Sequence, residues 1–175
     1  MTDKPAVVLR ERRDSSMLLA LRALAADEVD ACVSSGNTGA LIGLARHCCG
    51  TFEEVRTVAI CAQLPNVDHP THLLDVGANV DCTPSQLYQF ARMGCGLVKS
   101  LYPLDQTIGQ KPKVRALSIG VESGKGNQAV TDAVALCGDD ASMGFAGLIE
   151  ANQLLMDDCD AVSYTHLTLP TNREV

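Results

Sequence analysis

The stretch from residue 72 to residue 101, HLLDVGANVDCTPSQLYQFARMGCGLVKSL, decides the fold expected for this 175-residue chain. Its first five residues, HLLDV at 72–76, predict a buried strand, and a polar loop with a glycine follows. The segment TPSQ at residues 83–86 then combines a capping box with proline at the first helical position. Apolar residues recur at helical spacing as far as Leu101. The stretch therefore predicts a strand, a loop and an amphipathic helix.

The same alternation continues through the rest of the chain. We expect further strands over residues 31–34, 57–63, 114–119, 143–149 and 160–162. We also expect three further helices: one that begins after a cap at Asp14, one over residues 38–49, and one that follows the loop at residues 120–127 and ends at about Cys137. The strands are apolar throughout and do not alternate in polarity, which is typical of strands covered on both faces. Strands separated by helices indicate βαβ units, so we predict an α/β fold with a parallel sheet.

The composition excludes several classes of protein. Hydrophobic residues make up 46% of the chain and charged residues 20%, which is unlike a disordered protein. A net charge of −7 disfavours a broad nucleic-acid-binding surface. No apolar run approaches the ~20 residues that span a bilayer, and the first residues are too polar and basic for a secretory signal. We expect a cytosolic protein.

The eight cysteines are scattered, with no C-x-x-C pair, and the four histidines do not cluster with them. Most of the cysteines lie in apolar stretches, where a thiol packs as a small hydrophobic group. We therefore expect reduced cysteines without disulfides, and we assign no metal.

Three polar, glycine-containing loops are the candidate functional segments. The first has the sequence SSGNTG and links an expected strand to an expected helix. Its residues are Ser34, Ser35, Gly36, Asn37, Thr38 and Gly39. The glycines allow close approach of the backbone, while the hydroxyl and amide groups and the helix start offer donors to an anion. A simple N-cap turn uses the same residue types, and that alternative stays open.

The second loop, residues 75–81, carries Asp75, Gly77, Asn79 and Asp81 directly after a strand. Carboxylates at such a position can accept a proton, orient a donor or hold Mg²⁺. Turn and capping chemistry by the Asp and Asn side chains is the alternative.

The third loop, residues 120–127, has the sequence GVESGKGN and holds Glu122, Lys125, Gly126 and Asn127. A lysine between two glycines suits a phosphate or a developing oxyanion. The loop does not match a P-loop, because only three residues separate Gly120 from Gly124 and a glycine follows the lysine. Gly124, Gly126 and Ala129 satisfy the dinucleotide-binding spacing G-x-G-x-x-A, but the expected strand ends near residue 119 and a lysine fills the loop, so this match is a weak signal. A solvated surface lysine is the alternative.

All three loops follow strands, and ligands of parallel sheets lie beyond the carboxyl ends of the strands. We therefore expect the loops to meet at one edge of the sheet and to form a pocket for a small anion.

Five segments together resemble one known family. They are DSSM at residues 14–17, SGNTGAL at 35–41, LDVGANVD at 74–81, KGN at 125–127 and GLIEANQLL at 147–155. In this order and with these separations they are similar to the signature segments of the bacterial phosphate acyltransferases of phospholipid synthesis, often called PlsX. The resemblance covers residues 3–162.

The resemblance implies a Rossmann-like, three-layer α/β/α fold with a mainly parallel sheet. Members of the family are much longer, so the fold here would be incomplete at both ends, and residues 1–162 would be part of a catalytic domain. The implied reaction transfers a fatty acyl group from acyl-[acyl carrier protein] to inorganic phosphate and gives acyl phosphate. The implied protein is a bacterial, cytoplasmic homodimer, peripherally associated with the membrane, that uses no nucleotide cofactor.

In such a reaction Ser35, Asn37 and Thr38 would hold phosphate, and Lys125 would steady the phosphate or the oxyanion. The acidic loop, with Asp75, Asn79 and Asp81, would orient groups or polarise the nucleophile. A dehydrogenase-like enzyme that uses nicotinamide and a non-catalytic phosphate-binding or dinucleotide-binding module remain as alternatives.

Residues 163–175 do not fit the strand–helix pattern. The segment SYTHLTLPT resembles a translated sequencing adapter, so we expect residues 163–175 to be a non-native tail.

Overall fold

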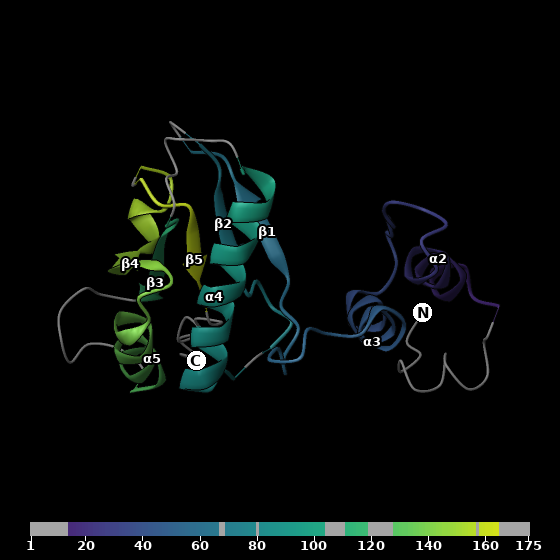
Figure 1. Cartoon of the computed structure of the whole chain (residues 1–175), viewed down its shortest axis with the longest axis horizontal. Coiled ribbons are helices and arrows are strands. Elements are labelled where there is room, and N and C mark those ends of the chain that lie inside the picture. The colour runs from purple at the N-terminus through teal and green to yellow at the C-terminus, as the bar shows by residue number, and fades with distance from the viewer. Residues whose placement is uncertain are drawn as a thin grey trace, which may run out of the picture. The chain divides into compact units, whose positions relative to one another are not determined.

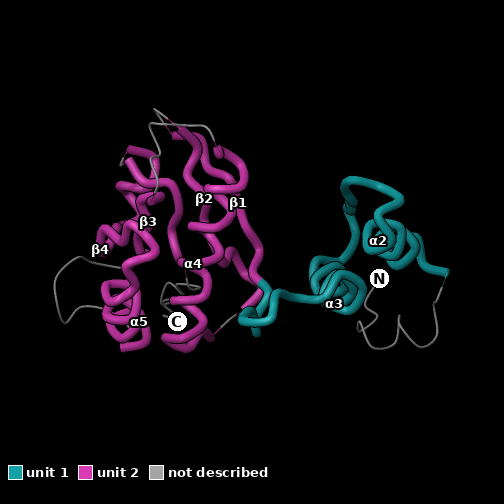
Figure 2. The backbone as a smooth tube through the Cα atoms, viewed as in Figure 1, with its two compact units in different colours: residues 1–58 teal, residues 59–175 magenta. Residues whose placement is uncertain are grey.

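The structure is a computed structural model that describes residues 14–66, 69–79, 81–103, 111–118, 128–156 and 158–164. The chain divides into two compact units, residues 1–58 and residues 59–175 (Figure 2).

The larger unit contains a five-stranded sheet. Its strands are β1 (Cys61–Leu64), β2 (Thr71–Leu74), β3 (Lys113–Ser118), β4 (Gly144–Glu150) and β5 (Ala161–Ser163). They lie in the order β1-β2-β5-β3-β4 (Figure 1). The pairs β2–β5, β5–β3 and β3–β4 are parallel. The predicted α/β fold with a mainly parallel sheet is therefore confirmed.

One strand departs from the prediction of a parallel sheet. Strand β1 pairs with β2 in the antiparallel direction, with Cys61 opposite Leu74 and Leu64 opposite Thr71. Only residues 65–70 connect the two strands. A parallel pair needs a crossover of about a dozen residues or more, so this connection allows only a hairpin.

Two helices cover one face of the sheet. Helix α4 (Pro84–Leu101) follows β2, and helix α5 (Gln128–Asp139) follows β3 (Figure 1). The predicted capping box is confirmed: Thr83 Oγ1 accepts the Gln86 N–H at 3.3 Å, and Gln86 Oε1 accepts the Thr83 N–H at 2.9 Å. The pair satisfies two main-chain donors that the first helical turn leaves unpaired.

The opposite face is covered differently. The connection from β4 to β5 contains the short 3₁₀ helix η1 (Ala151–Gln153), and its residues Leu154 and Cys159 pack in a cluster with Leu73 and Val162. Neighbouring residues of a strand point to opposite faces, so this cluster lies on the side away from α4. The chain passes from β2 to β3 and from β3 to β4 through helices on one face of the sheet, and it returns from β4 to β5 over the other face. Parallel connections arranged in this way are all right-handed, as is usual.

The smaller unit contains α2 (Ser16–Ala25) and α3 (Thr38–Cys49), which pack through Leu18, Leu21 and Leu44. Helix α3 has the predicted bounds. The cap expected at Asp14 is wrong, because Ser15 occupies the N-cap position of α2, and its side chain makes no capping hydrogen bond.

The strand predicted over residues 31–34 is also wrong. These residues form no regular element, and Val33 is 98% exposed. A strand is held by hydrogen bonds to a neighbouring strand, and every strand pairing among the described residues joins members of β1 to β5. Apolar character alone does not make a strand where no partner is present.

The start of the expected tail continues β5. Ser163 is the last residue of that strand, and its hydroxyl donates to the Leu87 carbonyl at 2.8 Å. The Asp75 N–H donates to the Tyr164 carbonyl at 3.2 Å. Residues 165–175 lie outside the described residues, and the non-native origin of the tail stays a prediction.

The described helices include none with both the length and the apolar character needed to cross a membrane.

The packing of α4 on the sheet predicts opposite effects of two glycine substitutions. A Cβ at Gly94 would lie 2.8 Å from the Ala161 Cβ, whereas a Cβ at Gly96 would meet nothing within 4 Å. Gly94→Ala should lower the free energy of unfolding by about 1–2 kcal/mol, because overpacking outweighs the gain in helix propensity. Gly96→Ala should raise it by about 0.5–1 kcal/mol. Urea unfolding of both variants measures the difference, and equal effects would contradict the close approach.

Candidate functional site

The second predicted loop lies at the carboxyl edge of the sheet, where β3 also ends. Strands β2, β5, β3 and β4 all run in one direction, so their last residues share an edge. Leu74 and Ala116 both pair with Ser163 of β5 between them. At the usual strand spacing, the ends of β2 and β3 are therefore roughly 10 Å apart. The second loop follows β2, and Ser118 ends β3 just before the third loop.

The third loop, with its candidate residues Glu122, Lys125, Gly126 and Asn127, lies outside the described residues.

The second loop is organised around Asp75, which is only 1% exposed. Its Oδ1 accepts the N–H groups of Ile60, at 2.8 Å, and Ala78, at 3.0 Å. Its Oδ2 accepts the Asn79 main-chain N–H and the Asn79 side-chain Nδ2, both at 2.7 Å. Four N–H donors thus surround the carboxylate, as burial of a charge requires.

The remaining candidates of this loop lie nearer to solvent. Gly77 has φ +120°, a conformation that side chains rarely adopt, so glycine is required for the tight turn. Asn79 is half-buried and Asp81 is exposed. The alternative of turn and capping chemistry therefore holds for the Asp75 side chain. Asn79 and Asp81 have polar side chains nearer to the surface.

The first loop lies in the smaller unit and begins α3. Asn37 Oδ1 accepts the Ala40 N–H at 2.9 Å and caps the helix, so the N-cap alternative holds for this oxygen. Ser34 Oγ accepts the Gly36 N–H at 3.2 Å. A Cβ at Gly36 would lie 2.5 Å from the Met17 Cε, so glycine allows α2 to approach the loop.

The other three candidates of the first loop are Ser35, Thr38 and Gly39, and all are exposed. The start of α3 therefore presents two hydroxyl groups to solvent, beside the positive end of the helix dipole.

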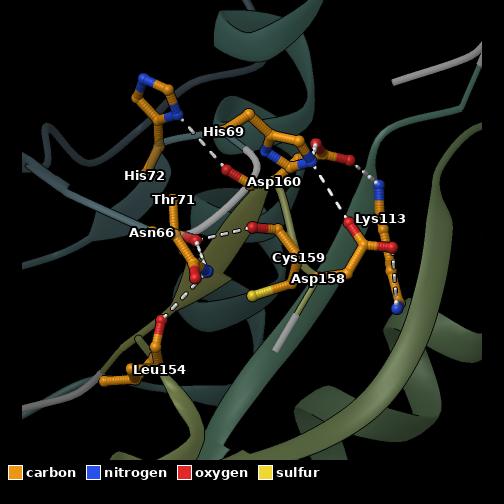
Figure 3. A network of polar contacts seen from close by, with 9 residues as sticks. All are labelled: Asn66, His69, Thr71, His72, Lys113, Leu154, Asp158, Cys159 and Asp160. Carbon is orange, nitrogen blue, oxygen red and sulfur yellow. Dashed lines mark hydrogen bonds and ion pairs between the residues drawn. The ribbon is translucent and has the colours of Figure 1, made fainter. Parts of the chain in front are cut away.

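The amino edge of the sheet holds a polar network that the sequence did not predict (Figure 3). Asp160, 3% exposed, precedes β5, and its Oδ2 accepts the Lys113 N–H at 2.5 Å. His69 Nε2 lies 3.4 Å from Asp160 Oδ1 and 3.2 Å from Asp158 Oδ1. The Thr71 hydroxyl donates to the Cys159 carbonyl at 2.7 Å. These contacts join the starts of β2, β3 and β5, and only the folded sheet brings them together.

Burial governs the titration of two groups in this unit. Desolvation raises the pKa of the Asp160 carboxyl, although the Lys113 N–H opposes the shift. Burial also raises the pKa of the Cys137 thiol to about 11, so this cysteine stays protonated and unreactive at neutral pH.

The cysteines of the described residues are all free thiols. Within the same residues, no group of three or more His, Cys, Asp and Glu side chains is arranged to hold a metal ion.

Comparison with known proteins identifies the family. The profile of the family described as "Fatty acid synthesis protein" matches residues 1–166. The chain belongs to this family. Proteins that are similar to this chain and are named phosphate acyltransferase confirm the resemblance seen in the sequence. The proteins from Cellvibrio japonicus and Saccharophagus degradans are 40% and 41% identical over 162 residues, which is 93% of this chain.

The match is to part of those relatives. It covers 47% of the Cellvibrio japonicus protein and 46% of the Saccharophagus degradans protein, so the chain spans about half the length of the curated relatives it matches.

A solved structure supports the fold of this family member. The EutD phosphotransacetylase from Staphylococcus aureus superposes with a TM-score of 0.58 over 90% of this chain and 56% of that chain. The sequences are only 15% identical, so the likeness concerns the α/β fold alone.

The hydrogen bonds of Asp75 predict a large effect of an isosteric change. In Asp75→Asn the new NH₂ group faces two N–H donors whichever way the amide turns. The free energy of unfolding should fall by roughly 3 kcal/mol, from lost charged hydrogen bonds and opposed donors. Asp81→Asn, at an exposed position, is the matched control and should change it by less than about 0.5 kcal/mol. Guanidinium unfolding followed by circular dichroism measures both, and similar midpoints would refute this account of the loop.

The buried Asp160 predicts a pH dependence of stability. The pKa of the Asp160 carboxyl is raised in the folded protein. Its contribution to the free energy of unfolding is therefore most favourable below its ordinary pKa of 3.8 and is lost as pH rises through the folded pKa. Asp160→Asn removes this titration. The stability of Asp160→Asn relative to the parent should therefore increase as pH rises from about 3.5 to 5.5. The exposed Asp139→Asn serves as control and should show no such trend in urea unfolding. A flat or opposite trend for Asp160→Asn would show that burial is not the main influence on the pKa of the Asp160 carboxyl.

Proposed function

We propose that this chain is part of an enzyme that transfers a fatty acyl group from acyl-[acyl carrier protein] to inorganic phosphate, giving acyl phosphate for phospholipid synthesis. The observation that carries the proposal is about 40% identity over 93% of the chain to proteins named phosphate acyltransferase. The position of the second loop at the carboxyl edge of a mainly parallel sheet supports it, because ligands bind at that edge.

The chemistry suits a site built from donors rather than from a strong base. A phosphate oxygen attacks the thioester carbonyl carbon, the tetrahedral intermediate collapses, and the carbon–sulfur bond breaks. Phosphate near neutral pH is already a nucleophilic anion, and the thiol that leaves has a pKa of about 8.5. What the protein must supply is the approach of two anionic reactants and stabilisation of the oxyanion.

The roles of the candidate residues follow from this requirement. Ser35, Asn37 and Thr38 hold the phosphate at the start of α3, where hydroxyl and main-chain donors meet the helix dipole. Lys125 neutralises the phosphate or the oxyanion. In the second loop, Asn79 and Asp81 orient the reacting groups, and Asp75 fixes the conformation of the loop that carries them.

The remaining properties are proposed with the function. The complete enzyme acts as a homodimer in the bacterial cytoplasm, associates peripherally with the membrane where its product is used, and needs no cofactor. Acyl carrier protein and phosphate are its partners. The 175-residue chain alone is expected to be inactive, since it spans about half the length of its relatives.

The proposal is tested by measuring acyl phosphate formation in a protein extended to the length of its relatives. Lys125→Ala should lower the rate at least about 100-fold, as loss of an oxyanion-stabilising group does. Lys99→Ala removes an equal charge from the last turn of α4, at the end of the helix remote from the second loop, and should leave the rate unchanged.

Two outcomes would contradict the proposal. Near-normal turnover of Lys125→Ala would remove this residue from the mechanism. Absence of acyl phosphate formation, together with thermal stabilisation by a nicotinamide dinucleotide, would favour a dehydrogenase-like enzyme.

A further inference from the structure

We propose that residues 31–34 are the docking site for a β-strand that lies in the part of the complete protein outside this 175-residue chain. The occupant is thus a further segment of the same polypeptide, recognised through main-chain hydrogen bonds. The inference holds whichever reaction the protein catalyses, because it concerns residues 14–58 of the smaller unit alone.

The main chain of this segment is free to pair. In the part of the chain that the structure describes, the main-chain groups of Ala31, Cys32 and Val33 make no hydrogen bond. Each of these residues carries one N–H donor and one C=O acceptor. A row of unpaired donors and acceptors along an extended segment is a template to which another strand adds.

One face of the segment is already covered. Ala31 and Val33 are exposed, whereas Cys32 and Ser34 are half-buried. Such an alternation with a period of two residues is typical of an extended backbone with one covered face. Cys32 packs against the hydrophobic cluster that joins α2 and α3. The two helices therefore cover the segment as helices cover a strand in an α/β fold, and a neighbouring strand is what the segment lacks.

The smaller unit has little core of its own. It consists of helices of ten and twelve residues, and helices of this length are marginal without tertiary packing. Within residues 14–58, the buried apolar side chains are those of Leu18, Leu21, Ala40 and Leu44. By contrast, Val33 is 98% exposed and Phe52 is 85% exposed. A further layer of structure is needed to give this unit a core.

The length of the relatives identifies the source of that layer. The chain matches only 47% and 46% of two phosphate acyltransferases, so more than half of each relative lies outside the match. That length is sufficient for several strands. A second copy of this chain would offer only the same four residues, and a sheet of two short strands is marginally stable in water.

The order of the elements predicts how the docked strand lies. Residues 31–34 precede the first loop and α3, just as β2 precedes the second loop and α4. A strand, a loop and a helix in this order are typical of parallel sheets, whose strands are covered on both faces. Docking therefore also covers the face that carries Val33. It places the first loop at the carboxyl edge of a sheet, which is the edge where ligands bind.

The test is hydrogen exchange followed by mass spectrometry on the 175-residue chain and on a protein extended to the length of its relatives. In the 175-residue chain, the amides of Cys32 and Val33 should exchange as fast as those of an unstructured peptide. In the extended protein, at least one of the two amides should exchange at least about 100-fold more slowly, because it is bonded in a sheet.

Val33→Asp gives a second readout. In the 175-residue chain it should shift the Tm by less than about 1 °C, because the side chain is exposed. In the extended protein it should lower the Tm by about 5 °C or more, because the charge lies on a covered face. Thr51→Asp adds the same charge at an exposed position after α3 and is the matched control. It should shift the Tm of either protein by less than about 1 °C.

Each outcome decides the inference. Fast exchange of both amides in the extended protein overturns it, as does a Tm of extended Val33→Asp equal to that of its parent. Equal protection in the two proteins also overturns it, because the partner strand would then lie within the 175 residues. Protection of the 175-residue chain that grows with its concentration would identify a second copy as the occupant instead. None of these outcomes changes the test of acyl phosphate formation, so the two proposals fail separately.

Discussion

The burial of one carboxylate organises the candidate site. Asp75 follows β2 directly and is surrounded by four N–H donors, one of them from Ile60, which precedes β1. A buried charge is stable only when its hydrogen bonds are satisfied, so the chain around Asp75 has little freedom. The carboxylate joins the hairpin of β1 and β2 to the loop that leads into α4. The position of every other polar group in the loop depends on this arrangement.

Local signals in the sequence were sufficient for some elements and insufficient for others. The start of α4 was predicted to the residue, because Thr83 and Gln86 satisfy the helix end by themselves. The strand expected over residues 31–34 does not form, because a strand depends on a partner that the segment does not specify. The direction of β1 was missed although the short connection to β2 is visible in the sequence, since length rather than hydrophobicity decides it.

The candidate site shows the same division. The residue types of the second loop indicated polar chemistry after a strand, and the structure places that loop at the carboxyl edge of the sheet. The sequence did not separate Asp75 from Asp81, because the burial of Asp75 depends on the N–H of Ile60, fifteen residues earlier. The network of Asp160, His69 and Lys113 was missed for a similar reason. Its members come from the starts of three strands, and no local pattern marks their convergence.

The place of β5 in the sheet has a consequence for how this unit assembles. Strands β2 and β3 are earlier in the chain, yet β5 lies between them and pairs with both. Strands β2 and β3 are therefore not joined in one sheet until residues 161–163 have been synthesised and have paired with both of them. Such non-local pairing slows folding and leaves strand edges exposed to other chains in the meantime. Until β5 is in place, the edges of β2 and β3 that pair with it have unpaired main-chain groups, and wrong pairing can occur there.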